Sequence, residues 1–222
     1  MTRLAIFDLD HTMIATDSDH AFTEFLIEQG LLDAAEAAAR NQQFYQDYCN
    51  GCLNIHEYLA FQLRALRDVL PAERDRLHRQ FMREKITPHL RDKARATVER
   101  HRRNGDELLV ISSTNEFIIT PICAAFGIGE VIGTALVCDE RGCFSGEIDG
   151  VPSLGEGKIV RLQQWLHARG KSRADYETVY FYSDSKNDLP LLRHADVAVA
   201  VNPDDTLRQT AQAEGWQIED WR

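Results

Sequence analysis

The chain has 222 residues, of which 44% are hydrophobic and 27% are charged, a composition typical of soluble globular proteins that argues against a disordered or fibrous chain. The 25 basic and 35 acidic residues give a net charge of −10, which would repel the phosphate backbone of a nucleic acid. No apolar run reaches the roughly 18 residues that span a bilayer, and Asp8 interrupts the first apolar run too early for a signal peptide. We therefore expect a cytoplasmic protein with no nucleic-acid or membrane partner.

The five cysteines are an odd number in a chain without an export signal, so we expect reduced thiols rather than a disulfide framework. Cys49 and Cys52 form a CxxC pair with His56 nearby. A structural zinc site needs four ligands, and a redox CxxC motif needs a preceding strand. The pair therefore gives only weak support for a metal or redox site.

Five short apolar runs predict strands that are buried on both faces of a parallel sheet. They cover residues 4–7, 108–111, 131–132, 179–182 and 197–201. Helical patterns lie between them: one opens at Pro88 and stops at Gly105, a second ends at Gly127, a third covers residues 158–170, and the last lies near residues 207–213. This alternation predicts an α/β fold with a Rossmann-like, doubly wound parallel sheet.

Two segments interrupt the alternation. The first predicted strand is separated from the second by about 100 residues, whereas a βαβ crossover takes about 30. Within this stretch, residues 19–86 contain only two glycines and one proline, and their apolar residues recur at spacings of three and four, which predicts a small helical bundle. Residues 135–149 alternate about a Glu-Arg-Gly turn and predict a β-hairpin. That hairpin is either a plain edge element or a flap over a site.

The ends of three predicted strands are strongly polar, and ligands of open α/β sheets bind beyond the carboxyl ends of strands. The residues there are Asp8, Asp10 and Thr12 after the first strand, Ser112 and Ser113 after the second, and Asp184, Asn187 and Asp188 after the fourth. Carboxylates that converge from two strands would repel one another unless a cation lay between them. All-oxygen ligands favour Mg²⁺.

Lys158 stands at the start of its predicted helix, where the helix dipole disfavours a cation, so we expect a nearby anion to offset this effect. Mg²⁺, a lysine and a hydroxyl are recurring parts of phosphoryl-transfer sites. In such a site one carboxylate can attack phosphorus to form an aspartyl phosphate, and a second one two residues away can act as an acid and then as a base.

These motifs resemble those of the haloacid dehalogenase (HAD) superfamily of hydrolases over essentially the whole chain. Residues 7–12 fit its DxDxT motif, residues 109–112 its apolar strand ended by Ser or Thr, Lys158 its third motif, and residues 184–188 its acidic fourth motif. The insertion resembles the C1-type cap of subfamily IB, the phosphoserine phosphatase branch, and residues 188–192 and 200–203 resemble a histidinol-phosphatase-like subgroup. The resemblance implies a core domain of residues 1–15 and 87–222 and a helical cap domain of residues 16–86.

The resemblance also implies a role for each matching residue. Asp8 would be the nucleophile and Asp10 the general acid and base, while Asp8, Asp184 and the carbonyl group of Asp10 would hold Mg²⁺. The phosphate group would be surrounded by Ser112, Ser113, Lys158 and Asn187, with Thr12 supporting the loop. Asp188 would orient Lys158 or the water molecules on the metal.

Three features depart from phosphoserine phosphatases. Those enzymes follow the serine of the second motif with two glycines, whereas Ser113 and Thr114 stand here and narrow the approach of a substrate. Serines flank Asp184 where much of the superfamily has glycines. Asp17 stands where the phosphatases have a substrate-binding glutamate and is one methylene shorter, and capping of the following helix is an equally good interpretation of it.

The leading interpretation is a Mg²⁺-dependent phosphomonoester hydrolase that acts on a small phosphorylated metabolite, with histidinol phosphate and phosphoserine-like compounds as candidates. The alternatives are a phosphotransferase or mutase with the same intermediate, and a non-enzymatic receiver-like module. Asp10 argues against the receiver, because an acid and base speeds turnover where a receiver needs a persistent phosphoryl group.

Overall fold

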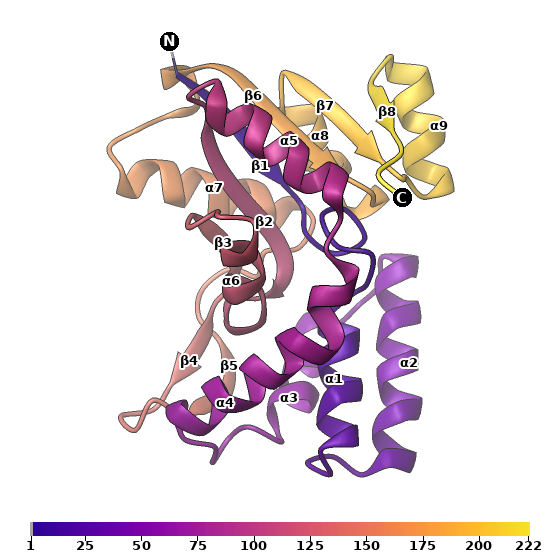
Figure 1. Ribbon diagram of the computed structural model, residues 1–222, viewed down its shortest axis with the longest axis vertical. Helices are drawn as coiled ribbons and strands as arrows, with labels where there is room; N and C mark the ends of the chain where they lie inside the picture. Colours follow the sequence, from indigo (N-terminus) through magenta and orange to yellow (C-terminus); the bar gives the residue numbers. More distant parts are fainter. Residues whose placement is uncertain (1) are drawn as a thin grey trace.

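A computed structural model describes residues 2–222 (Figure 1). Six strands form one sheet in the order β3-β2-β1-β6-β7-β8, and every neighbouring pair is parallel. The strands are β1 (Thr2–Phe7), β2 (Glu107–Asn115), β3 (Val131–Thr134), β6 (Tyr176–Ser183), β7 (Val197–Val201) and β8 (Gln217–Glu219). The central strand β1 aligns Ile6 with Leu109 of β2 and with Phe181 of β6. The predicted parallel α/β sheet is thus confirmed, and β2 extends to include residues 112–115.

Helices cover both faces of the sheet, because successive side chains of a strand point to opposite faces. Leu4 and Ile6 belong to a buried cluster with α7 (Glu156–Ala168), α8 (Leu189–His194) and α9 (Asp205–Glu214). Ala5 and Phe7 belong to a second cluster with α5 (Asp92–Arg103) and α6 (Glu116–Ala125). Short helical turns complete this part of the chain: η2 (Thr87–His89), η3 (Arg173–Asp175) and η4 (Lys186–Asp188).

The prediction that Pro88 opens a long helix is wrong. Pro88 lies in the 3₁₀ turn η2, and α5 begins only at Asp92. Between them Leu90 is extended and forms an isolated β-bridge with Ile14, which lies just after the DxDxT loop. The chain therefore leaves the helical conformation where it pairs with the segment that follows β1.

The insertion between β1 and β2 is helical, as predicted. It contains α1 (Ser18–Glu28), α2 (Ala34–Asn50), α3 (Ile55–Leu63), α4 (Pro71–Phe81) and the π-helical η1 (Met82–Ile86). We call residues 16–86 the inserted segment; that these residues form a separate cap domain stays a prediction. Figure 1 shows its helices beside the end of the sheet at which β1 stops.

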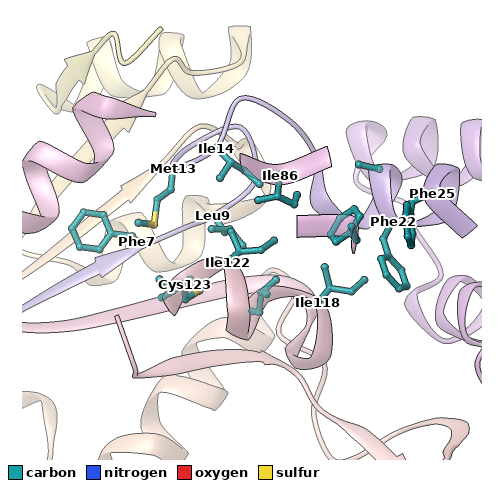
Figure 2. Close-up of a cluster of buried hydrophobic side chains, with 14 of the residues drawn as sticks. Phe7, Leu9, Met13, Ile14, Phe22, Phe25, Ile86, Ile118, Ile122 and Cys123 are labelled. Carbon is teal, nitrogen blue, oxygen red and sulfur yellow. The ribbon is translucent and has the colours of Figure 1, made fainter. Parts of the chain in front are cut away.

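The inserted segment shares a hydrophobic core with one face of the sheet. Phe22 and Phe25 of α1 belong to the same buried cluster as Phe7 of β1 and Ile118 of α6 (Figure 2). All four side chains are 0% exposed. Burial of a side chain of this size contributes about 1.5–3 kcal/mol, so this contact fixes α1 firmly against the sheet layer.

The predicted hairpin is present as the antiparallel pair β4 (Leu136–Cys138) and β5 (Phe144–Ile148). Its base packs on the inserted segment, where the Arg74 guanidinium lies 3.9 Å from the centre of the Phe144 ring. Strand β5 also contacts α3. The hairpin residues do not line the cavity beside Asp10 that is described below, which favours an edge element that supports the insertion. Separately, no helix within residues 2–222 is long and apolar enough to cross a membrane.

Candidate active site

The polar ends of β1, β2 and β6 meet at the carboxyl edge of the sheet, where ligands of such folds bind. Asp8 and Thr12 come directly after β1, and Asp184 directly after β6. The Thr12 hydroxyl lies 3.2 Å from Asp8 Oδ2 and 3.1 Å from Asp184 Oδ1, and it accepts a hydrogen bond from the Asp184 N–H. The structure therefore brings together the first and fourth sequence motifs around one threonine.

Lys158 lies between two carboxylates in the buried floor of this site. Its Nζ donates to Asp8 Oδ1 at 2.9 Å and to Asp188 Oδ2 at 2.8 Å, and Ser183 Oγ donates to the same Asp188 oxygen at 2.7 Å. The helix dipole disfavours a cation at a helix start, and these two carboxylates are the anions that we expected to offset this effect. Burial alone would lower the pKa of Lys158, but Asp188 and Asp8 together raise it, so the ammonium stays charged.

Gly157 allows Lys158 to reach this position. A Cβ atom on Gly157 would lie 2.1 Å from the carbonyl oxygen of Pro152, which is far closer than any van der Waals contact. Only glycine fits where the first turn of α7 crosses the preceding loop.

The charges of the site fit a divalent cation. Burial raises the pKa of Asp8 to about 7 against the opposing effect of Lys158. Burial, together with the charges of Asp8 and Asp188, also raises the pKa of Asp184 well above its usual range. Three carboxylates thus share one ammonium, and the donors near Asp8 and Asp184 are oxygen atoms. This is the ligand type that Mg²⁺ prefers.

Asp10 faces a different environment from Asp8. Its Oδ1 accepts from the backbone N–H of Ser18 at 2.7 Å, and its Oδ2 accepts from the Thr114 hydroxyl at 2.9 Å. Both carboxylate oxygens are therefore held by the inserted segment and by β2. Burial raises the pKa of Asp10 to about 6, and the charge of Asp17 adds to this effect. A carboxyl group of this kind can carry a proton near neutral pH.

The other predicted phosphate-binding residues lie around this centre in different ways. Ser112 is buried, and its Oγ accepts from the Thr114 N–H at 3.2 Å. Ser113 lines a cavity beside Asp10. Asn187 donates from Nδ2 to the carbonyl oxygen of Tyr48 in α2 at 3.0 Å, so its amide joins the fourth motif to the inserted segment.

The cavity beside Asp10, which we call the leaving-group cavity, lies between the inserted segment and β2. Its acidic residues are Asp10, Asp17 and Asp19, its aromatic residues are Phe44, Tyr45, Tyr48 and Tyr58, and its other residues are His20, Asn41, Leu53, Ile55, Ser113 and Thr114. Asp17 caps α1, because its Oδ1 accepts from the His20 N–H at 2.8 Å. The same side chain lines the cavity, and a role for Asp17 in binding substrate stays a prediction.

Sequence reasoning missed several residues of this site. Thr114 holds Asp10, and its position two residues after Ser112 on a strand is a signal, because alternate residues share one face. Ser183 holds Asp188 at the end of β6. No periodicity indicates the aromatic residues of the cavity, because they lie on helices whose orientation the sequence does not define.

The CxxC pair does not form a metal site. Cys49 and Cys52 are exposed. Throughout the part of the chain that the structure describes, no group of three or more His, Cys, Asp or Glu side chains is placed to hold a metal ion. A metal at Asp8 and Asp184 would therefore need a backbone oxygen, such as the Asp10 carbonyl, to complete its ligands.

The chain is similar to known hydrolases and phosphatases. The model of the haloacid dehalogenase-like hydrolase family matches residues 5–193. A histidinol-phosphatase of Neisseria meningitidis is 54% identical over 98% of each chain, and a probable phosphatase of Mycobacterium tuberculosis is 28% identical over 96% of this chain and 74% of its own length.

Solved structures show the same fold. A Bordetella pertussis protein of unknown function has a TM-score of 0.94, with 40% identity and full coverage of both chains. A phosphoserine phosphatase captured as an analogue of its phospho-aspartyl intermediate has a TM-score of 0.67, with 17% identity over all of this chain and 94% of that one. At this low identity the second likeness shows the fold alone.

Proposed function

Because the chain belongs to the haloacid dehalogenase-like hydrolase family and is a phosphatase, we propose that it hydrolyses histidinol phosphate, the monoester of an amino alcohol that carries no carboxylate. The histidinol-phosphatase at 54% identity supports this choice. The lining of the leaving-group cavity supports it independently, and that lining is the observation on which the proposed substrate depends.

The leaving-group cavity has the chemistry of a cation site. Asp10, Asp17 and Asp19 line it, and neither lysine nor arginine does. Burial and the charge of Asp17 raise the pKa of Asp19 well above its usual range, so a bound cation would stabilise the ionised form. Both substrates carry an ammonium group that these acids can bind. Phosphoserine also carries a carboxylate, which would meet the acids without a basic partner, whereas histidinol phosphate carries an imidazole ring in its place.

The aromatic residues suit the ring of this substrate. Tyr45, Tyr48 and Tyr58 line the cavity together with Phe44. Aromatic rings bind planar groups by offset or edge-to-face contact and bind cations over their faces. An imidazole ring can use both interactions, which a simple aliphatic leaving group cannot.

The cavity is about 40 Å³ in volume, which is room for only a few water molecules. Histidinol is larger than this, so we propose that the lining of the cavity moves apart when the substrate enters. Closure of such a lining over a bound substrate excludes water from the reacting group.

The remaining steps are assigned to residues of the sheet. Asp8 attacks phosphorus as the bond to the leaving oxygen breaks, while Lys158 and Ser112 bind the phosphoryl oxygens and Asp10 gives its proton to the leaving oxygen. Asp10 then takes a proton from the water molecule that attacks the aspartyl phosphate, which releases inorganic phosphate and restores the Asp8 carboxylate. Mg²⁺ held by Asp8, Asp184 and the Asp10 carbonyl would neutralise the charge on the phosphoryl group.

The test is a comparison of substrates with purified protein. We expect kcat/KM for histidinol phosphate to exceed that for phosphoserine by about 10²-fold or more, since an unpaired buried charge opposes the binding of phosphoserine. EDTA should abolish phosphate release and Mg²⁺ should restore it. Faster hydrolysis of phosphoserine would contradict the proposed substrate, and full activity in EDTA would contradict the metal.

Product analysis separates hydrolysis from transfer. The same reactions run with added glycerol as an acceptor should yield inorganic phosphate and no glycerol phosphate. Accumulation of the transfer product would instead identify a phosphotransferase with the same nucleophile.

A further inference from the structure

The carboxyl group of Asp10 is held from two sides, and one of the two donors is the side chain of Thr114. The Thr114 hydroxyl donates to Asp10 Oδ2 at 2.9 Å, while the backbone N–H of Ser18 donates to Oδ1 at 2.7 Å. One donor on each oxygen fixes the plane of a carboxyl group, which a single hydrogen bond does not do. Thr114 therefore helps to set the direction in which Asp10 presents its oxygens.

The end of β2 departs from regular pairing at the place where Thr114 stands. Ile111 lies opposite Ile132 of β3, but Asn115 lies opposite Thr134, so four steps along β2 match two along β3. Irregularities of this kind occur beside active sites, where they redirect a side chain. Here the side chain of a residue within the irregular stretch reaches the loop that follows β1.

Neighbouring groups hold the backbone around Thr114. Thr134 Oγ1 donates to the Ser113 carbonyl oxygen at 2.8 Å, and the Thr114 N–H donates to Ser112 Oγ at 3.2 Å. A Cβ atom on Gly133 would lie 2.7 Å from the Thr114 carbonyl oxygen, so only glycine allows β3 to approach this closely. Thr114 itself is 2% exposed. Its hydroxyl is thus held by packing and by the hydrogen bonds of its neighbours, as the positioning of a reacting group requires.

We propose that Thr114 is a positioning residue for the proton transfer that Asp10 carries out. This role rests on the proposed function, in which the bond from phosphorus to the leaving oxygen breaks as the proton of Asp10 moves to that oxygen. The acid must lie about 2.6–3.2 Å from the oxygen that it protonates, and a small misplacement lowers the rate steeply. Asp10 and Thr114 both line the leaving-group cavity, so the acid and the residue that orients it face the leaving group together.

Thr114→Val removes the hydrogen bond to Asp10 and little else. Valine has nearly the same shape and is also β-branched, which suits a strand. In single-turnover measurements the first step with histidinol phosphate should slow by about 10–100-fold, as expected for losing a hydrogen bond to a charged group. The first step with p-nitrophenyl phosphate should slow by less than about threefold, because p-nitrophenolate leaves without much protonation.

Two matched variants control for effects on the fold. Thr114→Ser keeps the hydroxyl and should bring the first step with histidinol phosphate to within about threefold of wild type. Thr97→Val makes the same change at a buried threonine of α5 that does not line the leaving-group cavity, and it should leave both rates unchanged. A loss in Thr114→Ser as large as that in Thr114→Val would overturn the proposal.

A double-mutant cycle shows whether Thr114 acts through Asp10. In the Asp10→Asn background, Thr114→Val should slow the first step with histidinol phosphate by less than about twofold, because the asparagine has no proton to deliver. Equal losses in the two backgrounds would overturn the proposal. If Thr114→Val does not fold, Thr114→Ala removes the same hydroxyl and takes its place in the cycle.

The same measurements distinguish a failure of this role from a failure of the proposed function. If Asp10→Asn slows both substrates equally, the acid assigned to the reaction is wrong and the role of Thr114 is overturned with it. If Asp10→Asn is selective and Thr114→Val is not, only the role of Thr114 is overturned. A higher half-saturating concentration of histidinol phosphate in Thr114→Val, with an unchanged maximal rate, would assign Thr114 to substrate binding and would also overturn the proposal.

Discussion

The two halves of the candidate active site are built by different means. The sheet half contains Asp8, Lys158 and Asp188, which are all at most 6% exposed and are joined by charged hydrogen bonds at the ends of parallel strands. The insertion half contains Asp17, Asp19 and the aromatic residues of the leaving-group cavity, which lie on helices and the turns before them. The charges of the sheet half lie on segments beside the carboxyl ends of the strands, whereas the residues that we propose to select the leaving group lie on the inserted helices and the turns before them.

This difference suggests that reaction and substrate choice can be altered separately. Asp10 is the exception, because it lies on the sheet side but is bound by Ser18 of the inserted segment and by Thr114 of β2. In the proposed reaction, a movement of the inserted segment would therefore affect proton transfer through this one carboxyl group.

The largest effect should come from Asp8→Asn in the sheet half. An amide is a poor nucleophile and a weaker metal ligand, so phosphate release should fall by about 10⁴-fold or more. The melting temperature should not fall, because the variant removes a buried charge that burial disfavours. Activity within tenfold of wild type would disprove the role of Asp8.

Asp10→Asn should reduce turnover of histidinol phosphate by about 10²–10⁴-fold, the usual contribution of positioned proton transfer. The p-nitrophenolate leaving group needs less protonation, so the rate of the first step with p-nitrophenyl phosphate should fall less. Single-turnover measurements with both substrates compare these losses. Equal losses would show that Asp10 acts through position or charge instead.

Asp17→Asn tests the insertion half alone. Asparagine caps helices as well as aspartate does, so α1 should stay intact while the cavity loses a negative charge. KM for histidinol phosphate should rise by about 10–100-fold, in line with a lost hydrogen bond to a charged group. The leaving group of p-nitrophenyl phosphate is not cationic, so KM for this substrate serves as the internal control and should change less than threefold. An equal loss with both substrates would argue against cation recognition.

Gln62→Met breaks the link between the halves. Gln62 in α3 accepts from Asn115 Nδ2 at 3.1 Å and donates to Asp19 Oδ1 at 2.8 Å, and the residue is fully buried. Methionine has a similar length but leaves both partners unsatisfied, which should lower the free energy of unfolding by about 1–3 kcal/mol. Denaturant titration measures this change, and Gln43→Met on the exposed face of α2 should have little effect.

The smallest effect concerns the support beneath the sheet half. His101 is buried between Asp106 and the Tyr182 hydroxyl, at 2.7 and 2.8 Å. Burial lowers the pKa of His101 below its ordinary value of 6.5. The negative charge of Asp106 acts in the opposite direction, but Asp106 also accepts a hydrogen bond from Arg3, which weakens its effect on His101.

The folded state therefore favours neutral His101, so its contribution to stability is present above pH 6.5 and is lost as the pH falls below that value. The raised pKa values of Asp8 and Asp10 act in the opposite direction. The contribution of His101, about 1 kcal/mol or a few degrees in melting temperature, is therefore read as the difference between wild type and His101→Gln as the pH falls. His101→Gln should weaken this pH dependence, whereas His167→Gln on exposed α7 should preserve it. An unchanged profile in His101→Gln would assign the acid sensitivity to other groups.

The sheet half was predictable from sequence because its signals are local. Asp8 and Asp184 each follow an apolar strand, and parallel strands bring such ends together whatever the rest of the chain does. The proximity of Lys158 to an anion was predictable, because the helix dipole disfavours a positive charge at a helix start. The roles of these residues stay predictions, although their proximity is now observed.

The insertion half was not predictable in the same way. Apolar residues at spacings of three and four indicate helices, but they do not show which face of α2 meets β2. The sequence therefore did not identify Tyr45 and Tyr48 as residues of the cavity. The start of α5 was misplaced because the bridge between Leu90 and Ile14 joins segments far apart in sequence.

Helix α2 has a consequence for protein engineering. Only Ala37, Asn41 and Phe44 of its 17 residues are buried, and it packs mainly on α1, so it contributes little to the core that fixes α1 and α4. The same helix lines the leaving-group cavity through Tyr45 and Tyr48. Randomising these two positions should therefore redirect the enzyme toward other amino-alcohol monoesters while sparing its thermal stability, which makes α2 the natural segment for a directed-evolution library.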